Sequence, residues 1–268
     1  MADPSREDAG YTADEMMTVT AARHLGDGQV CFVGIGLPSE AANLARLVHA
    51  PGVVLIYESG TIGTRPTVLP LSIGDGDLAE HADLVVGVPE IFAYWLQGGR
   101  IDVGFLSAAQ IDRYGNLNST VIGDYDAPTT RLPGAGGAPE IASGAGEVIV
   151  MLRHTARAFV PTVDFVTTLG FGRAGEGRGS APGAGPTVVI TDLGVLRPHP
   201  VTGELVLVAV HPGVSAAEVA DTTGWELAVA ADLRITAPPT PEELSVLRGL
   251  KERTRRAHAV SPPAPDRA

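Results

Sequence analysis

Two buried-strand patterns on either side of a helical segment constrain the fold of this chain more than any other feature. The apolar segments "QVCFVGI" (29–35) and "VVLIY" (53–57) have the length and composition of buried strands. Between them, residues 39–48 predict a helix with Ser39 as its N-cap. Its predicted inward side chains are Leu44, Leu47 and Val48. Strand, helix and strand in this order form the unit of a parallel sheet, so the sequence predicts an α/β protein.

The same alternation continues to about residue 187, after which the pattern changes. Further buried strands are predicted at 100–112 and 147–152, and helices from Thr12, at 89–99, at 215–224 and from Thr240. The segments "TVVITDLGVLR" and "GELVLVAV" indicate strands joined by hairpin turns. We therefore expect an open, mostly parallel sheet flanked by helices, with a hairpin-rich C-terminal part.

Composition suggests how the chain is divided. Residues 1–11 are polar and predict a flexible arm, residues 12–257 predict a single α/β domain, and the Pro-rich residues 258–268 predict a disordered tail. Two Gly-rich segments, 133–146 and 170–186, interrupt the domain. The second has no apolar pattern, so we expect a mobile surface loop there.

Charge and targeting signals exclude several classes of protein. The formal net charge of −12 at pH 7 repels phosphate backbones, so nucleic-acid binding is not expected. The N-terminal segment carries more acidic than basic residues, unlike a signal peptide. No apolar run approaches the ~20 residues of a membrane-spanning helix, so we expect a soluble, cytoplasmic protein without a membrane segment.

Cysteine and histidine usage predicts no metal site. Cys31 is the only cysteine, lies in an apolar run, and predicts a buried core thiol. The 7 histidines form no i,i+4 pair and no HExxH pattern.

The turn "VGIGLPSE" after the first strand resembles a dinucleotide-binding fingerprint only in part. Gly34 and Gly36 mark a turn where the backbone can approach a ligand. Ser39 stands where the third glycine would be, and Pro38 removes an N–H donor. A nicotinamide site is therefore disfavoured, and a tight turn without a ligand is the alternative.

Glu58 is the most informative single residue. It ends the buried strand 53–57 and is followed by Ser59 and Gly60. Ligands of open α/β sheets bind beyond the carboxyl ends of the strands, where a carboxylate shielded from water can act as a nucleophile. The alternative is a polar residue that only ends a strand.

Two further segments are candidate ligand sites. "AAQIDRYGNLNSTVIGDY" (108–125) is dense in polar side chains, namely Gln110, Asn116, Asn118, Ser119 and Thr120. Its alternative is an Asx-rich loop that organises its own backbone. "LPGAGGAPEIAS" (132–143) contains Gly134, Gly136 and Gly137, whose N–H groups can hold an anion or a developing oxyanion. Its alternative is a flexible hinge.

Taken in order, "GQVCFVGIGLPSEAANLARLVHAPGVVLIYESG", "AQIDRYGNLNSTVIGDY", "TRLPGAGGAPEIAS" and "VVITDLGVL" resemble the B (beta) subunit of family I coenzyme A transferases, and the glutaconate CoA-transferase beta subunits most. The resemblance runs from roughly residue 12 to 250 and implies an α/β fold of the isomerase/CoA-transferase type. It implies that Glu58, in the E-S-G motif, is the catalytic glutamate and that Gly137, in the G-x-G-G motif, is the backbone oxyanion donor.

The same resemblance implies the reaction and the partner. Coenzyme A and acyl-CoA would be substrates in a ping-pong exchange through a glutamyl-CoA thioester, with no metal and no nicotinamide. Gly34, Gly36, Ser59, Gly60, Gln110, Asn116, Asn118 and Gly136 are the predicted substrate- or CoA-binding residues. An A (alpha) chain would complete an A/B heterodimer or higher heteromer.

The sequence leaves alternatives for the substrate and for the type of reaction. The resemblance favours glutaconate or a similar dicarboxylate, with 3-oxoacids such as 3-oxoadipate second. Either needs a cation for the distal carboxylate, and Arg65, Arg113 and Arg131 lie near the matching motifs. Rival functions are an acyl-CoA or ring-opening hydrolase, a decarboxylase, and a non-catalytic ligand-binding subunit. The intact "ESG" favours a transferase.

Overall fold

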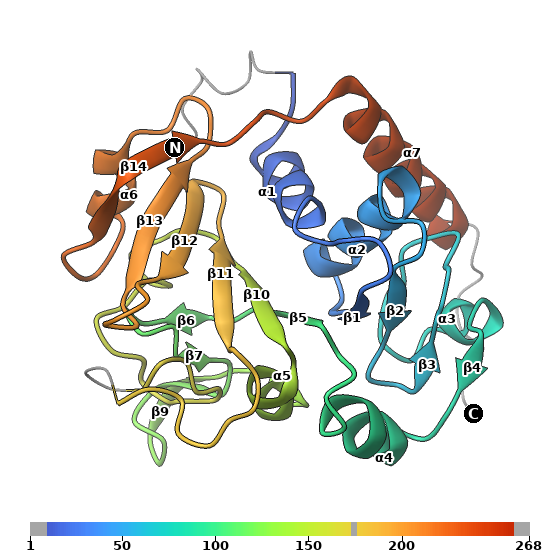
Figure 1. The fold of residues 1–268 in the computed structure, drawn as a ribbon, viewed down its shortest axis with the longest axis horizontal. Helices are drawn as coiled ribbons and strands as arrows, with labels where there is room; N and C mark the ends of the chain where they lie inside the picture. The colour runs from blue at the N-terminus through green and yellow to red at the C-terminus, as the bar shows by residue number, and fades with distance from the viewer. Residues whose placement is uncertain (1–9, 173–175, 260–268) are drawn as a thin grey trace.

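The computed structural model describes residues 10–172 and 176–259, and one large sheet dominates it (Figure 1). Its strands are β1 (Val30–Phe32), β2 (Val54–Ile56), β3 (Thr61–Ile62), β4 (Leu84–Val85), β5 (Val103–Leu106), β10 (Glu147–Met151), β11 (Pro186–Ile190), β12 (Gly194–Pro198), β13 (Leu205–Val210) and β14 (Ala228–Ile235). They form a 10-stranded sheet in the order β14-β13-β12-β11-β10-β5-β1-β2-β3-β4.

Parallel strands form the middle of this sheet. β2, β1, β5, β10 and β11 are consecutive parallel neighbours. Antiparallel pairs lie on both sides, β2-β3-β4 on one and β11-β12-β13 on the other, and β14 then pairs parallel with β13. The predicted mostly parallel sheet with a hairpin-rich C-terminal part is confirmed.

Helices cover both faces of the sheet. α1 (Ala13–Ala22), α2 (Leu37–Val48) and α7 (Pro241–Ala259) pack on one face, and α4 (Val88–Glu90), the π-helical turn η2 (Ile91–Leu96) and α5 (Ala138–Gly144) belong to the other (Figure 1). Short helices α3 (Gly76–Glu80) and α6 (Ala216–Asp221) lie near opposite ends. Two small hairpins complete the fold, β6 (Gln110–Ile111) with β7 (Leu117–Asn118) and β8 (Val121–Gly123) with β9 (Pro128–Arg131).

Alternation along the strands divides the apolar side chains between two cores. Cys31 and Leu55 belong to the core under α1, α2 and α7, whereas Phe32 and Ile56 belong to the core under η2 and α5. All four side chains are at most 2% exposed, because successive strand residues point to opposite faces and both faces are covered. The predicted core thiol of Cys31 is confirmed, and burial raises its pKa well above the usual range.

The second helix begins two residues before the predicted start. Gly36, with φ of 82°, is the N-cap of α2, and Pro38 lies in its first turn. The predicted N-cap Ser39 instead lies inside the helix, where its hydroxyl is 2.8 Å from the Tyr57 hydroxyl. The predicted inward position of Leu47 is wrong, since that side chain is 41% exposed.

Contacts at the chain ends differ from expectation, and one arginine makes contacts across the second Gly-rich loop. The Gly10 carbonyl accepts a hydrogen bond from Arg248, and α7 continues through Ala259, so the ordered part extends beyond both predicted domain boundaries. Residues 1–9 and 260–268, which hold the rest of the predicted arm and tail, lie outside the described residues. In the second Gly-rich loop, the Arg178 guanidinium donates to the carbonyls of Leu169, Gly170, Gly183 and Ala142. The Ala142 carbonyl belongs to α5, so Arg178 ties the described part of this loop to a helix, and the mobility of the loop stays a prediction.

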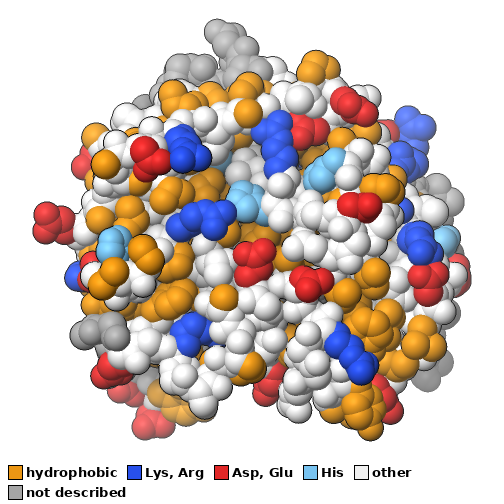
Figure 2. Space-filling view, viewed as in Figure 1, with side chains coloured by type: hydrophobic (Ala, Val, Ile, Leu, Met, Phe, Trp, Pro, Cys, Tyr) orange, Lys and Arg blue, Asp and Glu red, His pale blue; other side chains and the backbone are white. Residues whose placement is uncertain are grey.

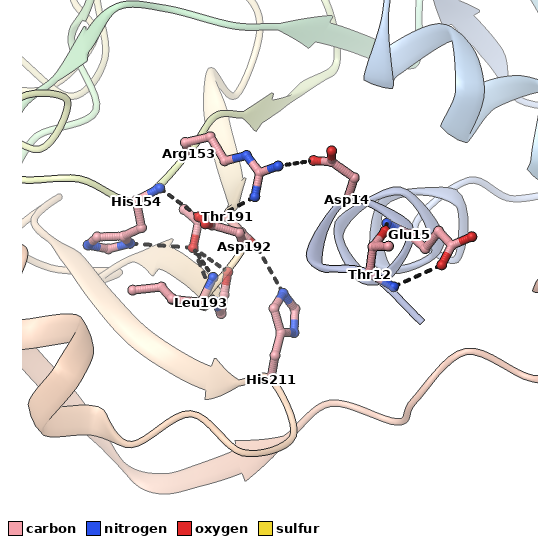
Figure 3. Close-up of polar contacts among 10 residues, drawn as sticks. Thr12, Asp14, Glu15, Arg153, His154, Thr191, Asp192, Leu193 and His211 are labelled. Atoms are coloured by element: carbon pink, nitrogen blue, oxygen red, sulfur yellow. Dashed lines mark hydrogen bonds and ion pairs between the residues drawn. The ribbon is translucent and has the colours of Figure 1, made fainter. Parts of the chain in front are cut away.

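A polar cluster fastens α1 to the ends of β10 and β11 (Figure 3). Arg153 forms ion pairs with Asp14 of α1 and with Asp192 in the β11–β12 turn. The backbone N–H of His154 donates to the Asp192 carboxylate at 2.7 Å. The His154 ring is 4% exposed, and burial lowers its pKa to about 4, so the ring is neutral at pH 7.

None of the described helices has both the length and the apolar character that spanning a membrane requires.

Candidate active site

The carboxyl ends of three neighbouring parallel strands converge on one cavity. Because β5, β1 and β2 are adjacent and parallel, the residues that follow them lie at the same edge of the sheet. These residues are Ser107 after β5, Gly34 after β1 and Glu58 after β2. All three line a cavity of ≈ 270 Å³, together with residues 135–138 and Ile73.

A tight turn places Glu58 in this cavity. The Gly60 N–H donates to the Tyr57 carbonyl at 3.0 Å and closes the turn. Gly60 has φ of 110°, and a Cβ on it would lie 1.9 Å from the Val86 carbonyl oxygen, so no other residue fits. The order E-S-G therefore has a physical reason, since the glycine lets the chain turn directly beside β4 and leaves the half-buried Glu58 at the strand end.

Behind the turn, a buried polar contact locks β2 against α2. The Tyr57 hydroxyl is 2.8 Å from the Ser39 hydroxyl, and the Asn43 amide donates to the Ser39 carbonyl at 3.0 Å. Burial raises the pKa of Tyr57 to about 12, so the phenol stays neutral. This contact fixes the residue directly before Glu58. The Ser59 hydroxyl is also buried, and it makes no hydrogen bond to any described residue.

Gly137 lies directly beside the Glu58 carboxylate in the cavity wall. A Cβ on Gly137 would lie 3.1 Å from Glu58 Oε1 and 2.5 Å from Phe92 Cζ. Any residue can adopt its φ of −85°, so the backbone conformation does not require glycine. Glycine is required because a side chain at this position would have no space. Within the described part of the chain, the N–H groups of Gly136 and Gly137 donate no hydrogen bond. Two unused backbone donors therefore lie at the wall that the Glu58 carboxylate approaches.

The rest of the wall is apolar. It is formed mainly by Phe32, Val33, Ile35, Pro38, Ile73, Phe105, Leu106 and Ile141. Among the described residues that line the cavity, Glu58 is the only charged one, and none is Lys, Arg or His. An apolar wall strengthens electrostatic interactions between Glu58, a bound thioester and the unused N–H donors.

The cavity gathers four of the predicted site residues, Gly34, Glu58, Gly136 and Gly137. Ser59 and Gly60 belong to the turn that presents Glu58, and Gly36 caps α2. Gln110, Asn116 and Asn118 are absent from the described wall and are at most 5% exposed.

These three amides are hydrogen-bonded to residues that do not line the cavity. Asn118 Nδ2 donates to Gln110 Oε1 and to the Val121 carbonyl, each at 2.7 Å. Asn116 Nδ2 donates to both Asp112 oxygens, and Asn116 Oδ1 accepts from the Gly170 N–H. Their observed contacts are those of a loop that organises its own backbone, and direct substrate binding by them stays a prediction.

The amide-rich hairpin is joined to the glycine loop. Ser119, next to Asn118, accepts the Gly134 N–H on its carbonyl and donates its hydroxyl to the Gly134 carbonyl, both at 2.9 Å. Gly134 leads directly into Gly136 and Gly137. The predicted polar segment therefore helps to hold the loop that carries the two unused N–H donors.

Sequence reasoning missed Ser107, Phe92 and Ile73 at this site. Ser107 lies inside the strand predicted at 100–112, and only the structure shows that this strand ends at Leu106, directly before Ser107. Ile73, from the 66–75 segment, lines the cavity, and Phe92, from the η2 turn, lies against Gly137 of its wall. Both positions result from tertiary packing.

The arginines considered for a distal carboxylate lie elsewhere. Arg65 binds the Asp83 carboxylate with two hydrogen bonds, Arg113 is 3.7 Å from Glu204, and Arg131 lies over the Tyr125 ring. None of the three lines the described wall of the cavity. No group of three or more His, Cys, Asp or Glu side chains in residues 10–172 and 176–259 is placed to hold a metal ion.

Comparisons with known proteins point to one family. A sequence comparison finds the chain 58% identical to the beta-type (B) subunit of the 3-oxoadipate CoA-transferase of Pseudomonas knackmussii, over 93% of this chain and 97% of that protein. It is 38% identical to the corresponding B-type subunit of the glutaconate CoA-transferase of Acidaminococcus fermentans, over 89% and 91%.

Solved structures agree with the sequence comparison. The crystal structure of the Acidaminococcus fermentans glutaconate CoA-transferase superposes with a TM-score of 0.82, 34% identity, and coverage of 90% of this chain and 94% of that chain. The decarboxylase AibA/AibB superposes with a TM-score of 0.79 and 28% identity, over 94% and 99%. The family model described as "Coenzyme A transferase" matches residues 14–222. The chain therefore belongs to the coenzyme A transferase family.

Proposed function

We propose that this chain is the beta subunit of a CoA-transferase that moves coenzyme A between an acyl-CoA and a free carboxylate through Glu58. The observation that carries the proposal is the position of Glu58. Its carboxylate lies at a strand end in an apolar cavity, facing the backbone of Gly137, whose N–H is unused. A carboxylate nucleophile and backbone donors for an oxyanion are the two groups that acyl exchange requires.

The first half of the exchange charges the glutamate. A Glu58 carboxylate oxygen attacks the thioester carbonyl carbon of the donor, the C–S bond breaks, and an acyl-glutamyl anhydride and CoA thiolate form. The thiolate then attacks the Glu58 carbonyl carbon of the anhydride. The bond between the Glu58 carbonyl carbon and the bridging oxygen breaks, so the donor leaves as a free carboxylate with that oxygen and Glu58 carries CoA as a thioester.

The second half runs the same steps backwards with the acceptor acid. The acceptor carboxylate attacks the Glu58 thioester, and the thiolate then attacks the acceptor carbonyl of the new anhydride. Each step passes through a tetrahedral oxyanion, which the N–H groups of Gly136 and Gly137 would stabilise. Losing one such donor costs about 3 kcal/mol in well-studied enzymes. The apolar wall would keep water from the two activated glutamyl species.

For the substrate, we propose a 3-oxo dicarboxylate of the 3-oxoadipate class ahead of glutaconate. The greater identity to the 3-oxoadipate relative supports this order, which reverses the one expected from the sequence. The described wall has no cation for the second carboxylate. We therefore propose that a partner alpha chain supplies it, consistent with relatives that are named as one subunit of a larger enzyme. Function in the cytoplasm remains a prediction.

The rival chemistry is that of the decarboxylase with a similar fold. A decarboxylase or hydrolase does not have to carry CoA on a side chain of the enzyme, whereas the proposed transferase must. The turn that presents Glu58 is intact here, which favours the transferase.

The test is a covalent trap in the complete alpha/beta enzyme. Incubation with 3-oxoadipyl-CoA or succinyl-CoA, followed by borohydride, should reduce a thioester on Glu58 to an alcohol that peptide mass spectrometry locates. Glu58→Gln should abolish the trap and lower transfer at least about 10³-fold, the scale for losing a nucleophile. Glu242→Gln, which changes an exposed acid of α7 that does not line the cavity, is the matched control and should retain transfer. Turnover without label on Glu58 would refute the proposal.

A further inference from the structure

The Glu58 cavity contains a hydroxyl group that the proposed reaction does not use. Among the described residues that line the cavity, Glu58 and Ser107 are the only two with polar side chains, and the others are apolar or glycine. The Ser107 side chain is exposed, and its hydroxyl makes no hydrogen bond to any described residue. A hydroxyl can donate one hydrogen bond and accept others. A ligand in the cavity can therefore bind Ser107 without breaking a hydrogen bond within the protein.

The order of the strands sets the separation of Ser107 from Glu58. Ser107 directly follows β5, Glu58 lies just beyond the end of β2, and β1 lies between these two strands and is parallel with both. Neighbouring strands are about 4.8 Å apart, so the two backbones are separated by about 10 Å along the edge of the sheet. Gly34, which follows β1 and also lines the cavity, has no side chain to fill this span. A short acyl segment over the end of β1 would therefore lie between Glu58 and Ser107.

The unused backbone donors lie beside Glu58. A Cβ on Gly137 would be only 3.1 Å from Glu58 Oε1, so the N–H groups of Gly136 and Gly137 suit the carbonyl group that Glu58 attacks. A 3-oxoacyl substrate has a second carbonyl group two carbons away from the first. Ser107, on the other side of β1, is the side-chain donor of the described wall that remains for this second group.

Charge does not distinguish a 3-oxo acid from a saturated acid of the same length. Figure 2 shows acidic and basic side chains interspersed over one face of the molecule, and the described wall of the cavity carries no cation. Adipate and 3-oxoadipate have the same two carboxylates, so any cation attracts both equally. Discrimination between them therefore requires a hydrogen-bond donor at the 3-oxo group.

We propose that Ser107 is a specificity-determining residue, whose hydroxyl donates a hydrogen bond to the 3-oxo group of a 3-oxoacyl substrate while Glu58 reacts at carbon 1. This role rests on the proposed function, since it takes Glu58 as the site of the reaction. A saturated acid offers no acceptor at carbon 3, so the hydrogen bond forms only with 3-oxo acids. Ser107 binds the substrate and transfers no proton.

The competing role for the same hydroxyl is at the reacting carbonyl, together with the N–H groups of Gly136 and Gly137. A donor at that carbonyl would accelerate transfer to every acid alike, because every acceptor passes through the same oxyanion. A donor to the 3-oxo group acts only on acids that contain this group. The ratio of kcat/KM for two matched acids therefore separates the two roles.

The experiment measures CoA transfer by the complete alpha/beta enzyme from succinyl-CoA to 3-oxoadipate and to adipate, which differ only in the 3-oxo group. The wild type should prefer 3-oxoadipate. Ser107→Ala should lower kcat/KM for 3-oxoadipate about tenfold, the scale of one hydrogen bond, and leave that for adipate within about twofold. Ser107→Thr keeps the hydroxyl and should keep the preference. Ser143→Ala is the matched control, because this α5 hydroxyl donates to the Glu140 carbonyl and does not line the described wall.

Borohydride trapping with succinyl-CoA in the same samples keeps this test apart from that of the proposed function, and thermal unfolding midpoints check that each variant folds. If Glu58 is labelled but Ser107→Ala loses the same factor for both acids, or loses nothing for either, the role of Ser107 is overturned and the transferase stands. A wild type that uses both acids equally, or a Ser107→Thr variant without the preference, would also overturn it. The expected change in ratio without label on Glu58 would refute the Glu58 mechanism instead. A wild type that transfers CoA to neither acid would overturn both.

Discussion

Substituting Gly137 by alanine tests the geometry on which the proposed chemistry depends. The added Cβ would lie 2.5 Å from Phe92 Cζ, 2.7 Å from Phe92 Cε1 and 3.1 Å from Glu58 Oε1. Carbon atoms in contact normally lie about 3.5–4.0 Å apart, so the ring and the backbone must separate by roughly 1 Å. The carboxylate oxygen needs to move by only a few tenths of an ångström. Crowding against Phe92 is therefore the larger effect.

Two magnitudes follow from these distances. Overpacking by one methyl group destabilises a well-packed site by about 1–3 kcal/mol. A displacement of about 1 Å in a catalytic group lowers the rate about 100-fold. Alanine keeps the N–H of residue 137, so the loss would come from displacement of the donor and of Glu58, not from removal of a donor. We expect Gly137→Ala to lower kcat/KM for CoA transfer about 100-fold.

The assay is CoA transfer by the alpha/beta enzyme, with urea unfolding of the same samples. Gly136→Ala is the matched control, because its Cβ meets no atom within 4 Å but its φ of 50° is strained for alanine. It should lose about 1 kcal/mol of stability without a comparable loss of rate. Phe92→Leu removes the ring atoms that clash, so the double variant with Gly137→Ala should recover part of the activity. Transfer by Gly137→Ala within threefold of the wild type would refute the reasoning, as would a double variant no better than Gly137→Ala alone.

Two further predictions concern stability. Gly60→Ala should lower the free energy of unfolding by at least about 3 kcal/mol and lower the rate of transfer, because the added Cβ would lie 1.9 Å from the Val86 carbonyl oxygen at a φ of 110°. Urea denaturation with m-values measures the free energy of unfolding, and a loss below about 1 kcal/mol would contradict the prediction. In the folded protein, burial holds the pKa of the His154 ring at about 4, whereas in the unfolded chain its pKa is about 6.5. Between these two pH values the unfolded chain binds a proton on His154 that the folded protein does not. Stability should therefore be lost between about pH 6.5 and pH 4 by up to about 3 kcal/mol, and His154→Gln, which does not titrate, should show an acid dependence shallower by about one proton. Equal slopes for the two proteins would rule out the assignment.

The local sequence predicted the start of a helix correctly where one interaction between nearby residues decides it. The capping boxes of Thr12 with Glu15 and of Thr240 with Glu243 both form, because each needs only residues three apart. The prediction of Ser39 as the N-cap was wrong because other interactions compete for the same residues. Gly36 can take the positive φ that starts α2 earlier, and Tyr57, 18 residues away, takes Ser39 as a partner in the core.

The residues of the site also fall into those that the local sequence could predict and those that it could not. The strand-end rule placed Glu58 at a carboxyl edge from the sequence alone, but it missed Ser107, because the strand predicted at 100–112 ends at Leu106 in the structure. It could not find Ile73, which lines the cavity, or Phe92, which packs against Gly137, because neither lies at the end of a buried strand and both reach the site by packing across elements. Nor could it tell that the amides of Asn116 and Asn118 are occupied by Asp112, Gln110 and the backbone, since those partners depend on how the hairpin folds.

The sequence by itself determined the parallel sheet, the position of Glu58 and the family. The physical reason is that burial patterns, strand ends and glycine turns are encoded by residues close together in the chain. Tertiary structure alone decided which faces meet: that Gly137 approaches Glu58, and that the described wall of the cavity has no cation. Those properties arise from segments far apart in sequence, whose distances are set by packing and not by any local preference.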